Sequence, residues 1–124
     1  IEEMGVICQS ENDEIETLSG GNQQKVVVGR WLMEPCSLLV LDEPFQGVDI
    51  KARRDIGTYI RKTSNSRATI VLVAELDEAL EIADRILVMN EKSLVGEHVN
   101  DNVNINKLLV DIAGKNLMPE QISR

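Results

Sequence analysis

The stretch Leu38-Leu39-Val40-Leu41-Asp42-Glu43 decides the fold. Its aliphatic run follows Ser37 and has the length of a strand buried on both faces, a pattern typical of parallel sheets. Such a strand carries two adjacent carboxylates to its carboxyl end, where open α/β sheets bind ligands. Asp42 is therefore a candidate ligand for Mg²⁺, and Glu43 a candidate general base for an attacking water. On this segment alone, an ordinary polar exit from a strand is an equally good interpretation.

Strands and helices alternate on both sides of this segment. Ser19 and Asp49 are good helix N-caps, and Pro35 and Gly114 are typical residues just beyond a helix. The expected elements are helices at 22–33, 50–63, 76–83 and 105–113, buried strands at 37–41 and 68–74, and a hairpin of strands 86–89 and 94–97. Residues 1–17 are expected to form a helix remnant followed by a loop. This order predicts an α/β fold with a mainly parallel sheet.

A second motif lies at Leu18-Ser19-Gly20-Gly21-Asn22. A serine cap and two glycines at a helix start present backbone N–H groups with no Cβ in the way, which is an arrangement that binds phosphate. Taken by itself, such a turn is more often an ordinary capped helix start.

Composition excludes several functional classes. The 124 residues hold 13 basic and 21 acidic side chains, a net charge of −8, which is unsuited to binding nucleic acid or an anionic membrane. No apolar run approaches the length of a membrane span, and no signal peptide is visible. Two cysteines in unrelated contexts and one histidine, His98, indicate neither a disulfide framework nor a zinc site. His98 is expected to lie on the surface.

Together, the motifs are much more specific. The order Leu18-Ser-Gly-Gly-Asn-Gln-Gln-Lys-Val26, a helix, Leu38 to Pro44 and then Gly47-Val48-Asp49 resembles that of ATP-binding cassette (ABC) ATPases, over residues 1 to about 97. The residues at these motif positions are similar to those in the second nucleotide-binding domain of ribose- and galactose-type importer ATPases. The resemblance implies a P-loop NTPase-type sheet, with residues 1–98 as the C-terminal portion of that domain and residues 99–124 as a tail with a short helix.

The resemblance also implies roles, carried over residue by residue. In the family, the signature contacts the γ-phosphate of ATP held by the opposite subunit, the Walker B aspartate holds Mg²⁺, the next glutamate is catalytic, and the D-loop aspartate communicates across the dimer. The matching positions are Ser19, Gly20, Gly21 and Gln23 for the signature, Asp42 for Walker B, Glu43 for the catalytic residue and Asp49 for the D-loop.

The sequence departs from the family pattern in three ways. Ala74 occupies the position of the switch histidine, and Phe45-Gln46 replaces the usual Thr-Arg. Residues 1–124 contain no GxxxxGK[ST] phosphate loop, and residue 1 is Ile. The chain is therefore expected to be incomplete at its N-terminus, to be unable to complete its own ATP site, and to expose a sheet edge that is prone to pairing.

The implied partners are a second ABC nucleotide-binding half in cis or in trans, transmembrane permease subunits and, indirectly, a periplasmic or extracellular sugar-binding protein. Nucleic acid is not among them. The implied location is the cytoplasmic side of the cell membrane, as a peripheral subunit. The alternatives are a non-transport ABC ATPase, a catalytically inactive interaction module or split-gene remnant that pairs with a complete half, and an unrelated α/β domain.

Overall fold

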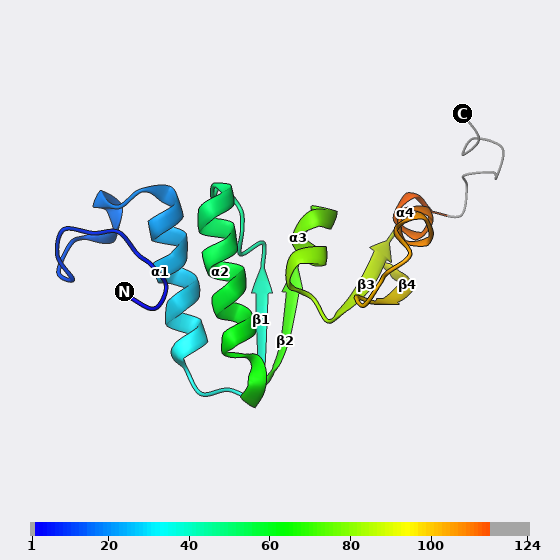
Figure 1. Cartoon of the computed structure of the whole chain (residues 1–124), viewed down its shortest axis with the longest axis horizontal. Coiled ribbons are helices and arrows are strands. Elements are labelled where there is room, and N and C mark those ends of the chain that lie inside the picture. The colour runs from blue at the N-terminus through cyan, green and yellow to red at the C-terminus, as the bar shows by residue number, and fades with distance from the viewer. Residues whose placement is uncertain (1, 115–124) are drawn as a thin grey trace. The chain divides into compact units, whose positions relative to one another are not determined.

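The computed structural model describes residues 2–114, which form two compact units. The first runs to Ile82 and the second begins at Ala83 (Figure 1). The first unit contains η1 (Ile15–Thr17), α1 (Gly20–Met33), β1 (Leu38–Asp42), α2 (Ile50–Lys62), η2 (Ser64–Ser66), β2 (Ala68–Leu72) and α3 (Leu76–Ile82). The predicted tail of residues 99–124 lies partly outside the described residues, and its separation from residues 1–98 stays a prediction.

Strands β1 and β2 form the predicted parallel pair, in register from Leu38 opposite Ala68 to Asp42 opposite Leu72. Leu39 and Leu41 point toward the core that the sheet shares with helices α1 and α2. Ile56 of α2 lies at the centre of this core with 0% of its surface exposed. Strand β1 and helices α1 and α2 therefore belong to one unit, so the predicted site residues that they carry share one rigid support.

The opposite face of the parallel pair is open, so the expectation of a strand buried on both faces is wrong. Leu38 and Val40 of β1 are each 54% exposed, and Ile70 of β2 is 52% exposed. Within residues 2–114, burial alternates along β1 because packed side chains cover one face of the sheet only. The sequence showed a continuous apolar run, but it could not show how many layers this chain itself supplies.

This open apolar face is expected to drive self-association. Val40→Lys places a charge at the centre of the face, and we expect light scattering to show less association at high concentration than for the unchanged chain. Thr58→Lys, at an exposed position on α2, is the matched control. Equal association in all three chains would contradict the prediction.

Both predicted N-caps are confirmed. The Ser19 hydroxyl oxygen accepts a hydrogen bond from the backbone N–H of Asn22 at the start of α1, and Asp49 Oδ1 accepts one from the N–H of Ala52 at 2.7 Å. The helix remnant expected in residues 1–17 is not formed. A turn at residues 2–5 and the short η1 take its place, and Met4 is buried against Gly29 of α1.

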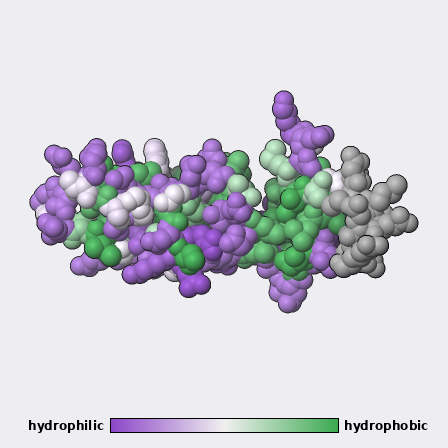
Figure 2. Space-filling model, turned by 90° about the horizontal axis from the view of Figure 1, so that it is seen from above, coloured by the Kyte–Doolittle hydropathy of each residue, from purple (hydrophilic) through white to green (hydrophobic). Residues whose placement is uncertain are grey.

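Within residues 83–114, the second unit is a hairpin with one helix. Strands β3 (Arg85–Asn90) and β4 (Ser93–Val99) are antiparallel, and α4 (Ile105–Ala113) covers them with a fully buried Leu108. Glu91 and Lys92 both have positive φ, as a two-residue hairpin turn of type I′ requires. Figure 2 shows apolar side chains at the surface of this unit, and the exposed apolar residues include Leu87, Met89, Leu94 and Val99.

His98 is buried at 7% exposure, which corrects the expectation of a surface residue. Its Nε2 lies 2.8 Å from Asp111 Oδ2, so the pair connects β4 to α4. Gly96 makes room for this contact, because a Cβ there would lie 2.3 Å from the same Asp111 oxygen. A carboxylate partner 13 positions away is what allows a polar ring to be buried here.

Candidate functional site

The two predicted carboxylates lie where β1 ends. Asp42 is exposed and Glu43 is half-buried. Glu43 has a φ of +48°, a left-handed conformation that is uncommon for a residue other than glycine. Its N–H donates to the carbonyl of Leu72 at 2.9 Å, and its carbonyl accepts from the N–H of Gln46. The backbone that presents the Glu43 side chain is therefore held on both sides, and such strain is often found at functional positions.

The predicted signature residues lie against the loop that precedes α2. A Cβ on Gly20 would come within 3.9 Å of the Gly47 carbonyl oxygen, and a Cβ on Gly21 would lie 3.2 Å from the Cβ of Ala52. The start of α1 thus approaches the start of α2, which Asp49 caps. The structure brings together the two glycines and the loop that carries Asp49, as one site would require.

Asn22 stands in the second predicted motif, but the sequence interpretation gave its side chain no role. Its Nδ2 donates to the Ser19 hydroxyl oxygen at 2.9 Å, whereas Gln23 donates from Nε2 to the carbonyl of Leu18. Asn22 occupies the third helical position after the cap, where capping boxes place a side chain that reaches back. That spacing was a signal that could have identified it.

The predicted switch position, Ala74, is exposed in the loop between β2 and α3. Helix α3 is tied to α2 by Arg53, whose Nη1 lies 2.7 Å from Asp77 Oδ2 and whose Nε lies 3.3 Å from Glu81 Oε2. The pKa of Glu78 is raised, mainly by burial, and the negative charge of Glu43 raises it further.

The pKa values of the adjacent carboxyls Asp77 and Glu78 are expected to lie further apart than usual, with Asp77 still the more acidic. The hydrogen bond from Arg53 lowers the pKa of Asp77 below its ordinary 3.8, whereas burial raises that of Glu78 above its ordinary 4.5. Because the pKa of Asp77 is lower in the folded state, its stabilising effect is present above pH 3.8 and is lost as the pH falls through the lowered pKa.

NMR titration of the side-chain carboxyls checks this expectation. Arg53→Gln should return the midpoint of Asp77 toward 3.8, and Arg54→Gln, an exposed neighbour on α2, should leave it lowered. A midpoint of Asp77 that does not move in Arg53→Gln would contradict the ion pair as its cause.

No cluster of three or more metal-binding side chains occurs among residues 2–114. Nucleotide sites usually hold Mg²⁺ by one or two carboxylates together with phosphate oxygens and water. Asp42, exposed at the end of β1, is the side chain suited to that purpose. The residues therefore fit a Mg²⁺ that arrives with its nucleotide.

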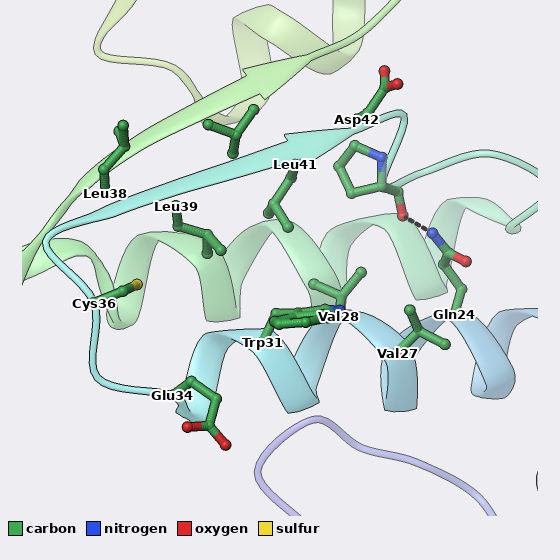
Figure 3. A pocket seen from close by; sticks show the side chains of 12 residues that line it. Gln24, Val27, Val28, Trp31, Glu34, Cys36, Leu38, Leu39, Leu41 and Asp42 are labelled. Carbon is green, nitrogen blue, oxygen red and sulfur yellow. Dashed lines mark hydrogen bonds between the residues drawn. The ribbon is translucent and has the colours of Figure 1, made fainter.

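A groove runs beside the edge of β1 that faces α1 (Figure 3). Val27 and Trp31 of α1 form one wall, and Gln24 closes one end by donating from Nε2 to the carbonyl of Pro44. The lining is mostly apolar, with Asp42 at its margin. This chemistry suits apolar side chains, so the groove is not the phosphate site.

Comparison with known proteins supports the family indicated by the motifs. Residues 3–46 match the ABC transporter family. The arabinose import ATP-binding protein of Pseudomonas savastanoi is 42% identical over 88% of this chain and 22% of its own length. The ribose import ATP-binding protein of Clostridium tetani is 36% identical over 88% of this chain and 22% of its own length. The chain thus spans about a fifth of the length of these relatives.

Solved structures share the fold. A dimeric ATP-binding cassette in a post-hydrolysis state with ADP and Pi matches with a TM-score of 0.68 at 20% identity, over 82% of this chain and 44% of that one. A bacterial Atm1-family ABC exporter with ATP bound matches with a TM-score of 0.66 at 24% identity, over 87% of this chain and 19% of that one. None of the helices in residues 2–114 is long and apolar enough to cross a membrane. The motifs, the match of residues 3–46 and the named relatives identify the chain with the ABC transporter family, and its fold is the one that the solved ATP-binding cassettes share.

Proposed function

We propose that this chain forms the signature, Walker B and D-loop part of an ATPase that drives monosaccharide import. The observation that carries the proposal is the packing of Gly20 and Gly21 against the loop that leads to Asp49, in the same unit as a strand that ends in Asp42 and Glu43. The names of the relatives, which are arabinose and ribose import ATP-binding proteins, support sugar import as the process.

Each side chain has a defined task in this proposal. Ser19 and the N–H groups of Gly20 and Gly21, with Gln23 beside them, bind the γ-phosphate of ATP held by an opposite half. Asp42 holds Mg²⁺, which when bound neutralises charge on the phosphates. Glu43 orients the attacking water and accepts its proton. Asp49, at the cap of α2, connects the site to the partner half.

The proposed partners follow from these tasks. A second nucleotide-binding half, in cis or in trans, holds the ATP whose γ-phosphate the signature contacts. The assembly acts beneath permease subunits on the cytoplasmic face of the membrane, and a sugar-binding protein acts on the other side. The isolated chain is then expected to bind ATP very weakly. Ala74 offers no imidazole to the γ-phosphate, so this half-site hydrolyses ATP more slowly than one with the histidine.

A chimera tests the proposal. The residues of this chain replace the matching 110-residue segment of the Pseudomonas savastanoi arabinose import ATP-binding protein, and ATP turnover is measured beside the unchanged relative. We expect the chimera to hydrolyse ATP. A chimera that folds and binds ATP without turning it over would overturn the proposal in favour of the inactive interaction module, which the alanine at position 74 also suits.

A further inference from the structure

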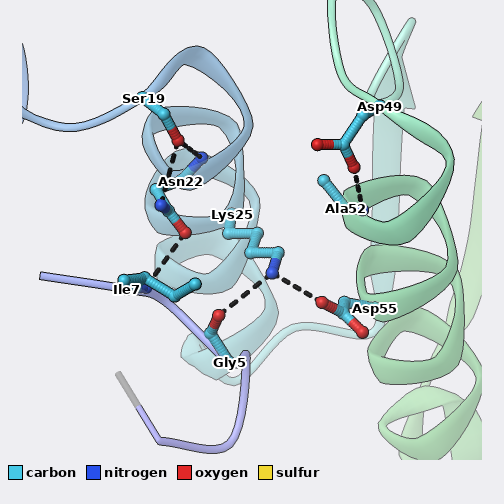
Figure 4. A network of polar contacts seen from close by, with 8 residues as sticks. All are labelled: Gly5, Ile7, Ser19, Asn22, Lys25, Asp49, Ala52 and Asp55. Atoms are coloured by element: carbon cyan, nitrogen blue, oxygen red, sulfur yellow. Dashed lines mark hydrogen bonds and ion pairs between the residues drawn. The ribbon is translucent and has the colours of Figure 1, made fainter.

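Asn22 connects the Ser19 hydroxyl to the amino-terminal segment of the chain (Figure 4). Its Oδ1 accepts a hydrogen bond from the backbone N–H of Ile7 at 3.0 Å, and its Nδ2 donates to the Ser19 hydroxyl oxygen at 2.9 Å. One side-chain amide therefore has a partner on each of its two atoms.

The partner at Ile7 fixes which way the amide points. A backbone N–H can only donate, so the atom of Asn22 that faces it must be the oxygen. The Nδ2 group is then turned toward Ser19, and the contact has only one polarity. The chemistry of its two partners therefore fixes the orientation of this amide.

This polarity decides what the Ser19 hydroxyl can do. A hydroxyl has two acceptor lone pairs and one donor hydrogen. The oxygen accepts from Nδ2 of Asn22 at 2.9 Å and, more weakly, from the N–H of Asn22 at 3.4 Å. Both lone pairs are thereby engaged, and among residues 2–114 the hydroxyl has no acceptor for its own hydrogen. Ser19 is exposed, so that hydrogen can be donated to a bound ligand or to water.

The segment that presents the Ile7 N–H is itself anchored. Lys25 Nζ donates to the carbonyl of Gly5 at 3.0 Å and lies 2.6 Å from Asp55 Oδ2 of α2. The Lys25 side chain is only 5% exposed. A buried ion pair thus holds the backbone two residues before Ile7, and with it the partner that orients Asn22.

We propose that Asn22 is a positioning residue that keeps the Ser19 hydroxyl as a hydrogen-bond donor for a phosphate oxygen of ATP. The proposal rests on the proposed function, because it requires that the start of α1 meets phosphate. Asn22 acts through Ser19, and its contribution disappears when the hydroxyl is removed. Without the amide, one lone pair of the hydroxyl oxygen loses its partner, so the hydroxyl can rotate and must be reoriented for each binding event.

A double-mutant cycle tests this dependence. Asn22→Leu removes the amide donor while keeping similar size and no charge, Ser19→Ala removes the hydroxyl, and the third variant carries both changes. Each is made in the chimera, and kcat/KM for ATP is measured. Each single variant is expected to lose about tenfold, as for a lost hydrogen bond to a charged group, and the double variant to lose no more than Ser19→Ala alone. Asn65→Leu, in η2 beyond the opposite end of α2, is the control and should be unchanged.

A second readout does not depend on hydrolysis. The full chain is titrated with inorganic phosphate, and the amide resonances of Gly20 and Gly21 are followed by NMR. Phosphate is expected to shift these amides in the unchanged chain and to shift them several-fold less in Asn22→Leu and in Ser19→Ala. Thermal unfolding of each variant shows whether α1 is still formed.

The outcomes separate the two proposals. A chimera without turnover overturns the proposed function, and the phosphate titration then decides the role of Asn22. Turnover that falls in Ser19→Ala but not in Asn22→Leu overturns the positioning role alone. Losses that multiply in the double variant also overturn it, because Asn22 would then act independently of the hydroxyl.

Discussion

Replacing Glu43 by glutamine is expected to lower ATP turnover in the chimera by about 10²–10⁴-fold, the usual contribution of a positioned general base. ATP should remain bound, because the carboxylate acts on water and the substitution removes a charge without changing the size of the side chain. Single-turnover kinetics with a separate measurement of ATP binding distinguishes the two effects.

Glu91→Gln is a closely matched control for this experiment. Glu91 also has a positive φ, 46° against 48° for Glu43, and it lies in the turn between β3 and β4. Any cost of placing glutamine in a left-handed conformation is therefore shared by both variants. Turnover that falls equally in the two, or that persists in Glu43→Gln, would remove Glu43 from the catalytic role.

Local chemistry made much of this site predictable. Ser19 and Asp49 cap helices through hydrogen bonds that span three residues, so their role is visible in a short window of sequence. An aliphatic run followed by two carboxylates predicts a strand end, and the structure places Asp42 as the last residue of β1. The parallel pairing of β1 with β2 also follows, since a helix separates them.

Contacts between distant residues were not predictable in this way. The exposure of Val40 depends on which layers cover the sheet, and the burial of His98 depends on Asp111 in a different element. Arg53 meets Asp77 across 24 positions. The same holds for Asn22, whose partner at Ile7 lies 15 positions away in a segment that the sequence suggested was a helix remnant. No periodic pattern specifies such pairs.

The ion pair between Lys25 of α1 and Asp55 of α2 should be costly to break. Asp55→Ala leaves the Lys25 ammonium, 5% exposed, with the Gly5 carbonyl as its remaining partner in the network of Figure 4. Removing one partner of a buried pair costs about 3–5 kcal/mol, and we expect about 3 kcal/mol because Asp55 is itself 34% exposed. For a unit of this size, that loss lowers the midpoint of thermal unfolding by about 10–20 °C.

The paired variant Lys25→Met with Asp55→Leu distinguishes an unpaired charge from lost packing. It removes both charges and fills the space with apolar atoms, so most of the stability lost in Asp55→Ala should return. Denaturant unfolding of the full chain measures both variants. If the double variant is as unstable as Asp55→Ala, the cost lies in packing around α2. If stability returns while the phosphate-induced shifts at Gly20 and Gly21 stay small, the ion pair is needed to orient Asn22, since the amino-terminal segment then lacks its anchor at Gly5.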